Sequence, residues 1–296
     1  MKSKYRNTIE NVERCNIYII LPVHNRKEIT KGFLECLKEQ SYKNFTLILI
    51  DDGSTDGTKE LLDDYYFKSV LIHGDGNLYW GGGLHEGYKY IQKVYNKNII
   101  SGNDIVLICN DDIFFDNRLL ESIVLELDTS GNNSIIHSTV YDKKTKNIVH
   151  NGIKYDFKKM SFKAAKSYEE INCLPTRCLF MRASAFVNVN GYKQKSIRHY
   201  LSDYYLTLSF YKEGYSLVQS IRVIVYLDCS TTKNIKKNFN ATFRRKYYDV
   251  KSPKYIISRL SFAFFISKGI YKVLLPVKVL KEALVDFLRY LFRDRI

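Results

Sequence analysis

The chain has 296 residues, of which 45% are hydrophobic and 26% charged, a balance typical of a globular protein with a sizeable core and not of a disordered or fibrous one. Its six cysteines are scattered with no Cys-x-x-Cys pair, and no apolar run reaches the ~18 residues of a membrane-spanning helix, which argues against a disulfide scaffold and an integral membrane protein. Most of the net charge of +15 falls in residues 233–296, which carry 16 Lys and Arg against 4 Asp and Glu. Such an uneven distribution predicts a basic segment with a role of its own.

Strand and helix patterns alternate through the first half of the chain. Apolar β-branched runs predict strands, and apolar residues at helical spacing predict helices. The predicted strands span residues 16–23, 45–52, 69–76 and 104–112, and the predicted helices span residues 29–40, 58–66, 84–96 and 117–128. This alternation predicts an α/β fold with a mostly parallel mixed central sheet and helices on both faces.

The second half is less regular. We expect a hairpin or edge strands over residues 134–142 and 147–156, a helix that ends at Gly214, a strand over residues 216–228, and a basic helical C-terminal extension after it. The predicted division is a lead-in of residues 1–15, an α/β domain of residues 16–228 and the extension of residues 229–296.

Carboxylates stand at the ends of two of the predicted strands. Asp51 and Asp52 follow one apolar run, and Asp111 and Asp112 follow another. Open α/β sheets bind their ligands at the carboxyl ends of the strands, which favours a functional site. A turn is the alternative, because Asp-Gly is a common turn dipeptide and Asp is a good helix cap.

Five segments, in this order, resemble the successive motifs of family 2 glycosyltransferases. They are LPVHNR, LILIDDGSTDGT, GDGNLYWGGGLHEG, LICNDDIFFDNRLL and HYLSDYYLTLSFYKEGY. The resemblance covers roughly residues 16–228 and implies an inverting enzyme with a GT-A fold. It also implies that a nucleotide sugar is the donor.

The first two motifs are expected to bind the nucleoside. By resemblance, the segment that holds Pro22, His24 and Asn25 borders the nucleoside, and the His24 ring, which replaces the usual Tyr, stacks on the base. Asp52 is expected to accept a hydrogen bond from a pyrimidine N3–H, while Asp51 orders the turn or approaches the ribose. A structural role at the strand end is the alternative for His24.

The glycine-rich segment lacks the third glycine of a GxGxxG dinucleotide motif. It resembles instead a family segment in which Asn77, Gly83 and His85 are in register, with Leu84 where relatives carry an Arg that contacts the diphosphate. Trp80 and the glycines predict backbone close to a flat sugar or base. The alternative is a glycine-rich loop with a packed Trp.

The CNDDI segment occupies the position of the family's D-x-D motif. Asp112 matches the main metal-binding Asp, and Asn110, where the first Asp usually lies, can donate a hydrogen bond to sugar or ribose. Asp111 is also expected among the residues that bind the substrate or the nucleotide. A divalent cation, Mg²⁺ or Mn²⁺, neutralises the charge that develops on a diphosphate leaving group.

An inverting transfer also needs a base to deprotonate the acceptor hydroxyl. By resemblance Asp203 is this base, and Ser202 stands where relatives have Glu. An N-cap of the helix that begins here is the alternative, and both roles are compatible.

The last twenty residues predict a basic amphipathic helix. Its apolar face comprises Leu280, Leu284, Phe287, Leu288, Leu291 and Phe292. Such a helix is expected to lie on an anionic membrane surface, or else to dock on the α/β domain or on a second copy in a homodimer. With the polar N-terminal stretch, this predicts a cytoplasmic protein peripherally associated with the inner face of the cell membrane.

Together these features predict transfer of a sugar from a UDP- or dTDP-sugar to a saccharide acceptor that is lipid-linked or part of a cell-surface polysaccharide. The segment GNLYWGGG resembles the rhamnosyltransferase-like branch of the family. One alternative is a nucleic-acid-binding protein, suggested by the charge and the 24 tyrosines, but no nucleic-acid motif accompanies them, and we expect no nucleic-acid partner. The other is a sugar nucleotidyltransferase, which needs a glycine-rich phosphate loop that the first motif lacks.

Overall fold

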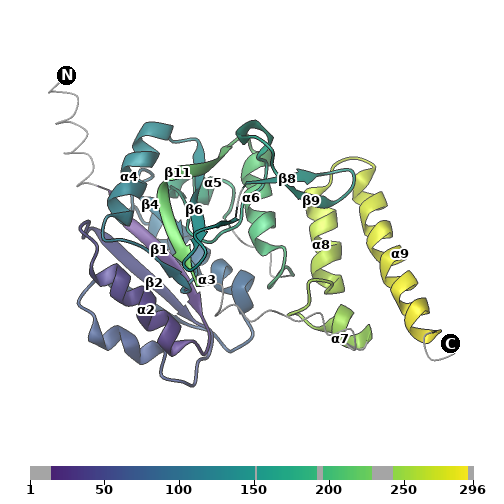
Figure 1. Cartoon of the computed structure of the whole chain (residues 1–296), viewed down its shortest axis with the longest axis horizontal. Coiled ribbons are helices and arrows are strands. Elements are labelled where there is room, and N and C mark those ends of the chain that lie inside the picture. The colour runs from purple at the N-terminus through teal and green to yellow at the C-terminus, as the bar shows by residue number, and fades with distance from the viewer. Residues whose placement is uncertain (1–14, 151, 192–195, 229–242, 293–296) are drawn as a thin grey trace.

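The computed structural model describes residues 15–150, 152–191, 196–228 and 243–292 (Figure 1). All but one residue of the predicted lead-in, and the first part of the predicted extension, lie outside the described residues. The division into three parts therefore stays a prediction.

One mixed sheet forms the centre of the fold. Its strands follow the order β3-β2-β1-β4-β10-β6-β11-β5, with β7 paired to β6, and a separate hairpin is formed by β8 and β9. The neighbours among β1 to β4 are parallel, β6 and β11 are parallel, and β10 is antiparallel to both β4 and β6. The strands are β1 (Ile17–Val23), β2 (Phe45–Asp51), β3 (Ser69–His73), β4 (Ile105–Ile108), β5 (Ile113–Phe114), β6 (Ser134–Asp142), β7 (Ile148–His150), β8 (Ile153–Asp156), β9 (Ser161–Ala164), β10 (Leu179–Arg182) and β11 (Ser216–Leu227).

Helices cover both faces of this sheet, as predicted. Alternate residues of a strand point to opposite faces, so Ile17 and Ile19 pack with helices α2 and α4, while Tyr18 and Ile20 pack with α3, α5 and α6. The helices of the α/β part are α2 (Lys27–Lys38), α3 (Tyr79–Asn96), α4 (Leu119–Ser130), α5 (Ala183–Asn188) and α6 (Ser202–Lys212).

Two of the predicted helices differ from the structure. The expected helix over residues 58–66 is a short 3-10 helix (Lys59–Asp64) in which only Leu61 is buried, so little packing favours a longer helix. Helix α3 begins at Tyr79 and not at Leu84, so the glycines expected in a loop lie in its first turn. The hairpin expected from residues 134–142 and 147–156 is confirmed in its first part, the antiparallel pairing of β6 with β7. The rest of the second segment differs, because β8 pairs with β9 in a separate hairpin.

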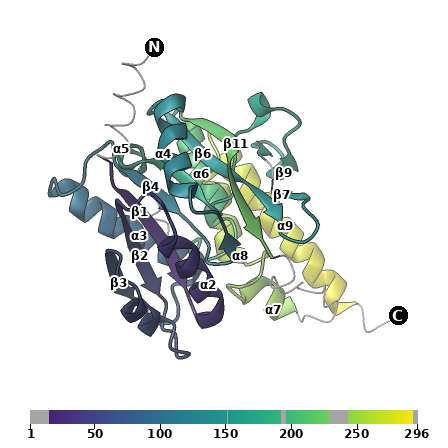
Figure 2. The same cartoon turned by 60° about the vertical axis from the view of Figure 1, so that its left-hand side comes forward.

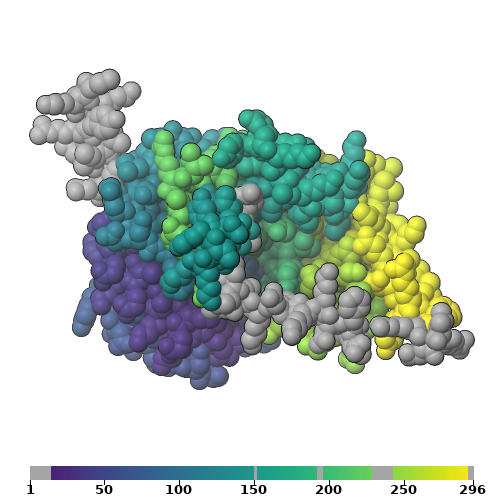
Figure 3. All heavy atoms as spheres, in the orientation of Figure 1, coloured from purple at the N-terminus to yellow at the C-terminus, as the bar shows by residue number. Residues whose placement is uncertain are grey.

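The described part of the C-terminal extension contains helices α7 (Phe243–Tyr248), α8 (Ile256–Ile266) and α9 (Tyr271–Leu291). Phe262 and Ile266 of α8 are buried against Tyr155 and Leu208, which joins α8 to the β8–β9 hairpin and to α6. Helix α9 lies alongside α8 in both cartoon views (Figures 1 and 2). It forms one edge of the molecule in the space-filling view (Figure 3). None of the helices in the described part of the chain is long and apolar enough to span a bilayer.

Candidate active site

A pocket of about 350 Å³ lies at the carboxyl ends of β1, β2 and β4, where the sequence predicts the site. Half of the residues that line it are predicted site residues. The lining consists of Pro22, Val23, His24, Arg26, Asp52, Gly76, Tyr79, Trp80, Asn110, Asp111, His199 and Lys251.

The carboxylate of Asp52 organises one wall of the pocket. Its Oδ1 accepts the backbone N–H groups of Gly76 at 2.9 Å and Leu78 at 3.1 Å, and its Oδ2 accepts that of Tyr79 at 2.9 Å. The first N–H groups of a helix have no partner within the helix, so Asp52 caps α3 from a distant strand and sets its start at Tyr79. A carboxylate has about four acceptor positions, and the remaining one on Oδ2 is available to a ligand.

Asp51 and Asn25 shape the loop after β2 and do not line the pocket. Asp51 is buried, and its Oδ1 accepts the backbone N–H of Ser54 at 3.0 Å. Asn25 Oδ1 accepts the backbone N–H of Thr55 at 2.8 Å, and the Asn25 N–H donates to Ser54 Oγ at 2.9 Å. Of the two expectations for Asp51, this arrangement favours the one in which it orders the turn.

His24 has a defined ring orientation. Its Nδ1 lies 2.6 Å from the backbone carbonyl oxygen of Asp52, and because a carbonyl only accepts, Nδ1 carries the proton. The other ring nitrogen, Nε2, lies 3.3 Å from the side-chain nitrogen of Asn25. The exposed ring is therefore held at the edge of the pocket, where it can stack on a base.

Two glycines of α3 allow this helix to pack closely on β1. A Cβ on Gly83 would lie 2.7 Å from Cβ of Pro22, and one on Gly87 would lie 2.6 Å from Cγ2 of Ile20. These glycines let α3 approach β1 closely. Asn77 is exposed, His85 is buried, and neither lines the pocket, so the structure does not bring these two predicted residues into the site.

Two arginines hold the adjacent carboxylates after β4. Arg26 Nε lies 3.1 Å from the carboxylate of Asp111, which also accepts the hydroxyl of Thr30 at 2.9 Å. Asp112 lies between the guanidinium groups of Arg26, at 3.7 Å, and Arg177, at 3.4 Å. Burial raises the pKa of Asp111 to about 6, although Arg26 opposes this shift.

The donor set after β4 fits a metal ion that is shared with a diphosphate. No group of three or more His, Cys, Asp and Glu side chains able to hold a metal occurs among the described residues, which argues against a cage made by the protein alone. Mg²⁺ is commonly bound by one or two carboxylates together with substrate phosphates. Oδ1 of Asp112 is buried, lies 3.4 Å from Nε of Arg177 and accepts no hydrogen bond from a described residue. Asp112 does not itself line the pocket, so a metal ion held by this oxygen would take the place of Arg177 beside it.

Trp80 connects the pocket to the predicted base. Its indole Nε1–H donates to Oδ1 of Asp203 at 2.7 Å, and the hydroxyl of Ser202 lies 3.4 Å from the same oxygen. Asp203 stands in the first turn of α6, behind the wall that Trp80 contributes. Burial raises the pKa of Asp203, and hydrogen bonds from Thr176 and Trp80 and the charge of Arg177 oppose this shift.

Six residues that were not predicted as site residues also line the pocket: Val23, Arg26, Gly76, Tyr79, His199 and Lys251. Arg26 is the last residue of the segment LPVHNR, and His199 is the first residue of HYLSDYYLTLSFYKEGY, so both lie within segments that resemble the family motifs. Nδ1 of His199 is buried and has no partner among the described residues, and burial lowers the pKa of this ring. Lys251 comes from the extension and had no signal beyond the basic character of that segment.

The fold occurs in solved glycosyltransferases. TarS 1–349 of S. aureus in complex with UDP-GlcNAc superposes with a TM-score of 0.59 at 14% identity, over 94% of this chain and 73% of that one. The mannosyltransferase PcManGT of Pyrobaculum calidifontis in complex with GDP-Man and Mn²⁺ superposes with a TM-score of 0.56 at 12% identity, over 90% and 69% of the two chains. The predicted GT-A fold is confirmed by these similarities.

Sequence comparison gives the family. The amylovoran biosynthesis glycosyltransferase AmsB of Erwinia amylovora is 26% identical over 215 residues, which is 68% of this chain and 65% of AmsB. Other curated relatives, uncharacterized glycosyltransferases of Rickettsia and Haemophilus influenzae, are matched over only 19–22% of their own length. The family model "Glycosyl transferase family 2" matches residues 18–188. The chain therefore belongs to glycosyl transferase family 2.

Proposed function

We propose that this glycosyltransferase moves a sugar from a UDP- or dTDP-sugar to a saccharide acceptor, with inversion at the anomeric carbon. The hydrogen bond between Trp80 and Asp203 carries the proposal, because it joins a carboxylate suited to act as a base to a wall of the pocket at the strand ends. The sugar stands between the diphosphate and Trp80 in this proposal.

Asp52 selects the base of the nucleotide. The remaining acceptor position on its Oδ2 suits the N3–H of uracil or thymine, and His24 provides an aromatic face beside it. The fold does not decide this point, since one structural neighbour carries UDP-GlcNAc and another GDP-Man. The pyrimidine preference therefore rests on Asp52.

The diphosphate lies toward Asp112 and Asn110. A divalent cation, Mg²⁺ or Mn²⁺, held by Asp112 would neutralise charge on the phosphates when bound. Asn110 and Asp111 contact the ribose or the sugar from the pocket wall.

Asp203 removes the proton from the acceptor hydroxyl. The hydroxyl oxygen forms a bond to the anomeric carbon, the bond from that carbon to the phosphate oxygen breaks, and the nucleoside diphosphate leaves with the electron pair. A buried carboxylate of raised pKa is a stronger base than an exposed one, which suits this step.

The test of this function is the variant Asp203→Asn. It keeps the shape of the side chain but cannot take a proton, so we expect transfer to fall roughly a hundredfold or more while UDP affinity stays close to wild type. Asp63→Asn, at an exposed position of the 3-10 helix, is the matched control. Near-normal transfer by the Asp203 variant would remove this residue from the chemistry.

The outward face of α9 is the proposed contact with an anionic membrane. The apolar residues of this stripe are between 42% and 63% exposed. They are Val273, Val277, Leu280, Leu284, Leu288 and Leu291. Lysines and an arginine flank the stripe, and basic amphipathic helices bind anionic lipid surfaces. This placement, at the inner face of the cell membrane, brings the enzyme to lipid-linked acceptors.

The membrane contact is tested by vesicle sedimentation. Serine at Val277, Leu284 and Leu288 together is expected to abolish sedimentation with phosphatidylglycerol vesicles, and Ile99→Ser, at an exposed site on the α/β part, is the control. Unchanged sedimentation of the triple variant, together with a loss of dimers in light scattering, would assign the stripe to a homodimer instead.

We also propose three more detailed assignments. These are the rhamnosyltransferase-like branch, the absence of a nucleic-acid partner, and the division between the catalytic domain (residues 16–228) and the extension (residues 229–296). Membership of the glycosyltransferase family favours sugar transfer over the alternatives of nucleotidyl transfer and nucleic-acid binding.

A further inference from the structure

The C-terminal extension contributes one side chain to the pocket. Lys251 lines it, and its Nζ lies 5.9 Å from the centre of the ring of Tyr79, another lining residue. The backbone N–H of Lys251 donates to Oδ1 of Asp249 at 2.8 Å, and that of Ser252 donates to the Asp249 carbonyl at 2.9 Å. Lys251 is therefore carried on an ordered turn.

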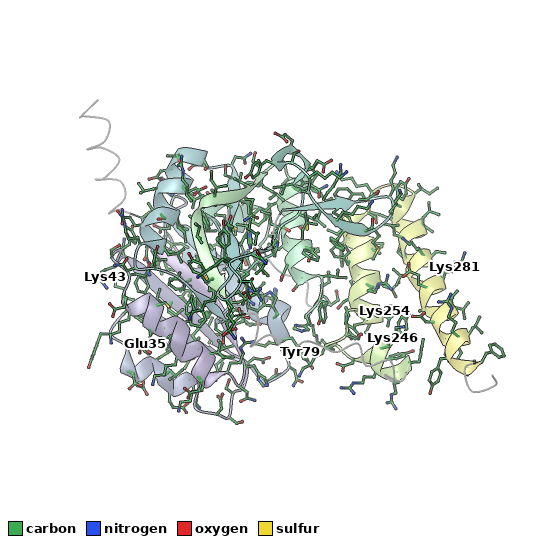
Figure 4. The ribbon with its side chains drawn as sticks, viewed as in Figure 1. Glu35, Lys43, Tyr79, Lys246, Lys254 and Lys281 are labelled. Atoms are coloured by element: carbon green, nitrogen blue, oxygen red, sulfur yellow. The ribbon has the colours of Figure 1, made fainter. Side chains whose placement is uncertain are left out.

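This turn is anchored to helix α9 by a single carboxylate oxygen. Oδ2 of Asp286 accepts hydrogen bonds from Lys246 Nζ at 2.6 Å, the Tyr247 hydroxyl at 2.6 Å and Lys254 Nζ at 2.8 Å. These donors lower the pKa of Asp286, the Lys246 bond first among them. Figure 4 shows Lys246 and Lys254 beside α8 and α9, with Tyr79 on the side of the α/β part that faces them.

The hydrogen bonds to Asp286 come from residues on both sides of Lys251 in the chain. Lys246 and Tyr247 precede Lys251 in the chain, and Lys254 follows it, so Asp286 holds the turn on both sides. The Ser252 hydroxyl closes the turn by donating to the Lys246 carbonyl at 2.5 Å. The position of Lys251 at the pocket therefore depends on α9.

A diphosphate that enters the pocket needs a positive charge beside it. The pocket wall carries the carboxylates of Asp52 and Asp111, and the family's usual diphosphate-binding arginine is replaced by Leu84, which is fully buried. Arg26, the other lining cation, is already paired with Asp111 and Asp112. The exposed Lys251 has no ion pair with a described residue, so its charge is available to an anion that enters the pocket.

We propose that Lys251 binds the diphosphate of the nucleotide donor, and that Asp286 is the positioning residue that presents Lys251 to it. The extension thereby completes the donor site of the α/β part. This inference rests on the proposed function, because it takes the pocket to be the donor site.

The first experiment measures affinity for UDP, UMP and uridine by calorimetry in the presence of Mg²⁺. Lys251→Met is expected to weaken UDP binding about tenfold, in line with the loss of one charged contact, and to leave uridine binding unchanged. Lys281→Met, an exposed lysine of α9, is the matched control and should bind all three like wild type. Wild-type UDP affinity in Lys251→Met would overturn the inference.

The second experiment is a double-mutant cycle. Asp286→Asn alone is expected to weaken UDP binding about threefold or more, and Asp286→Glu to restore part of it. In the Lys251→Met background Asp286→Asn should have no further effect, because its only route to the nucleotide has been removed. Additive losses would show that Asp286 acts through general stability and would overturn its positioning role.

These measurements distinguish a failure of the proposed function from a failure of the inference about Lys251. A wild-type protein that binds UDP no tighter than uridine has no diphosphate site, and this contradicts the proposed function along with the inference. A wild-type protein that prefers UDP, with the same preference in Lys251→Met, contradicts only the inference.

Discussion

The hydrogen bond from Trp80 to Asp203 makes a quantitative prediction for the variant Trp80→Phe. Phenylalanine keeps an aromatic ring in the wall but removes the indole N–H that lies 2.7 Å from Oδ1 of Asp203. A hydrogen bond to a charged group contributes about 1.5–3 kcal/mol. Since this bond favours the ionised carboxylate, its loss should destabilise the form that acts as the base.

The expected shift follows from the conversion of about 1.36 kcal/mol per pKa unit. Burial already raises the pKa of Asp203 above its ordinary value, and Trp80 is one of the groups that oppose this shift. Without Trp80 the pKa should rise further, by about 1 to 2 units. The base is active only when ionised, so the acidic limb of the rate profile should move to higher pH by the same amount.

The assay is the pH profile of kcat for wild type and Trp80→Phe at saturating donor and acceptor. The variant should lose most activity on the acidic side and recover toward wild type at higher pH. Thermal unfolding serves as the control for damage to the wall. An acidic limb at the wild-type position, with activity reduced equally at every pH, would refute the reasoning and leave Trp80 with a packing role only.

Three further predictions concern the metal, the packing and the extension. Asp112→Ala should reduce the gain in UDP affinity that Mn²⁺ provides by about tenfold or more, and unchanged metal dependence in a titration would exclude Asp112 as a ligand. Gly83→Ala should lower the free energy of unfolding by about 1–3 kcal/mol in a urea titration, because the new Cβ would lie 2.7 Å from Cβ of Pro22; wild-type stability would contradict this close approach. Because its pKa is lowered, ionised Asp286 stabilises the fold above the ordinary carboxyl pKa of about 4, and this contribution is lost as the pH falls below that value. The melting temperature of wild type should therefore fall more steeply between neutral and acidic pH than that of Asp286→Asn.

Much of the fold follows from local patterns in the sequence. The apolar runs predict β1, β2 and β4 well, because these strands bury both faces under helices. The pattern misses the start of α3, since the cap of this helix is Asp52, 24 to 27 residues away from the N–H groups that it accepts. The helix propensities of the residues around Tyr79 cannot reveal a cap that comes from a distant strand.

The site likewise contains residues that the motifs predict and a residue that only the tertiary structure places there. Residues such as His24, Asp52 and Trp80 belong to ordered motifs, so the motif order placed them at the pocket. The contribution of Lys251 depends on how α8 and α9 dock, which is a tertiary property without a local signal. For the glycines of α3 the sequence could not separate two roles, because packing against β1 and contact with a flat ligand both require small residues.

The most direct test of the central claim is a panel of nucleotide sugars, scored for release of nucleoside diphosphate in the presence of a saccharide acceptor, with and without divalent cation. We expect turnover with a UDP- or dTDP-sugar, a requirement for Mg²⁺ or Mn²⁺, and loss of transfer in Asp203→Asn. Turnover with a purine nucleotide sugar alone would contradict the assignment of Asp52, and turnover that is independent of Asp203 would contradict the proposed chemistry.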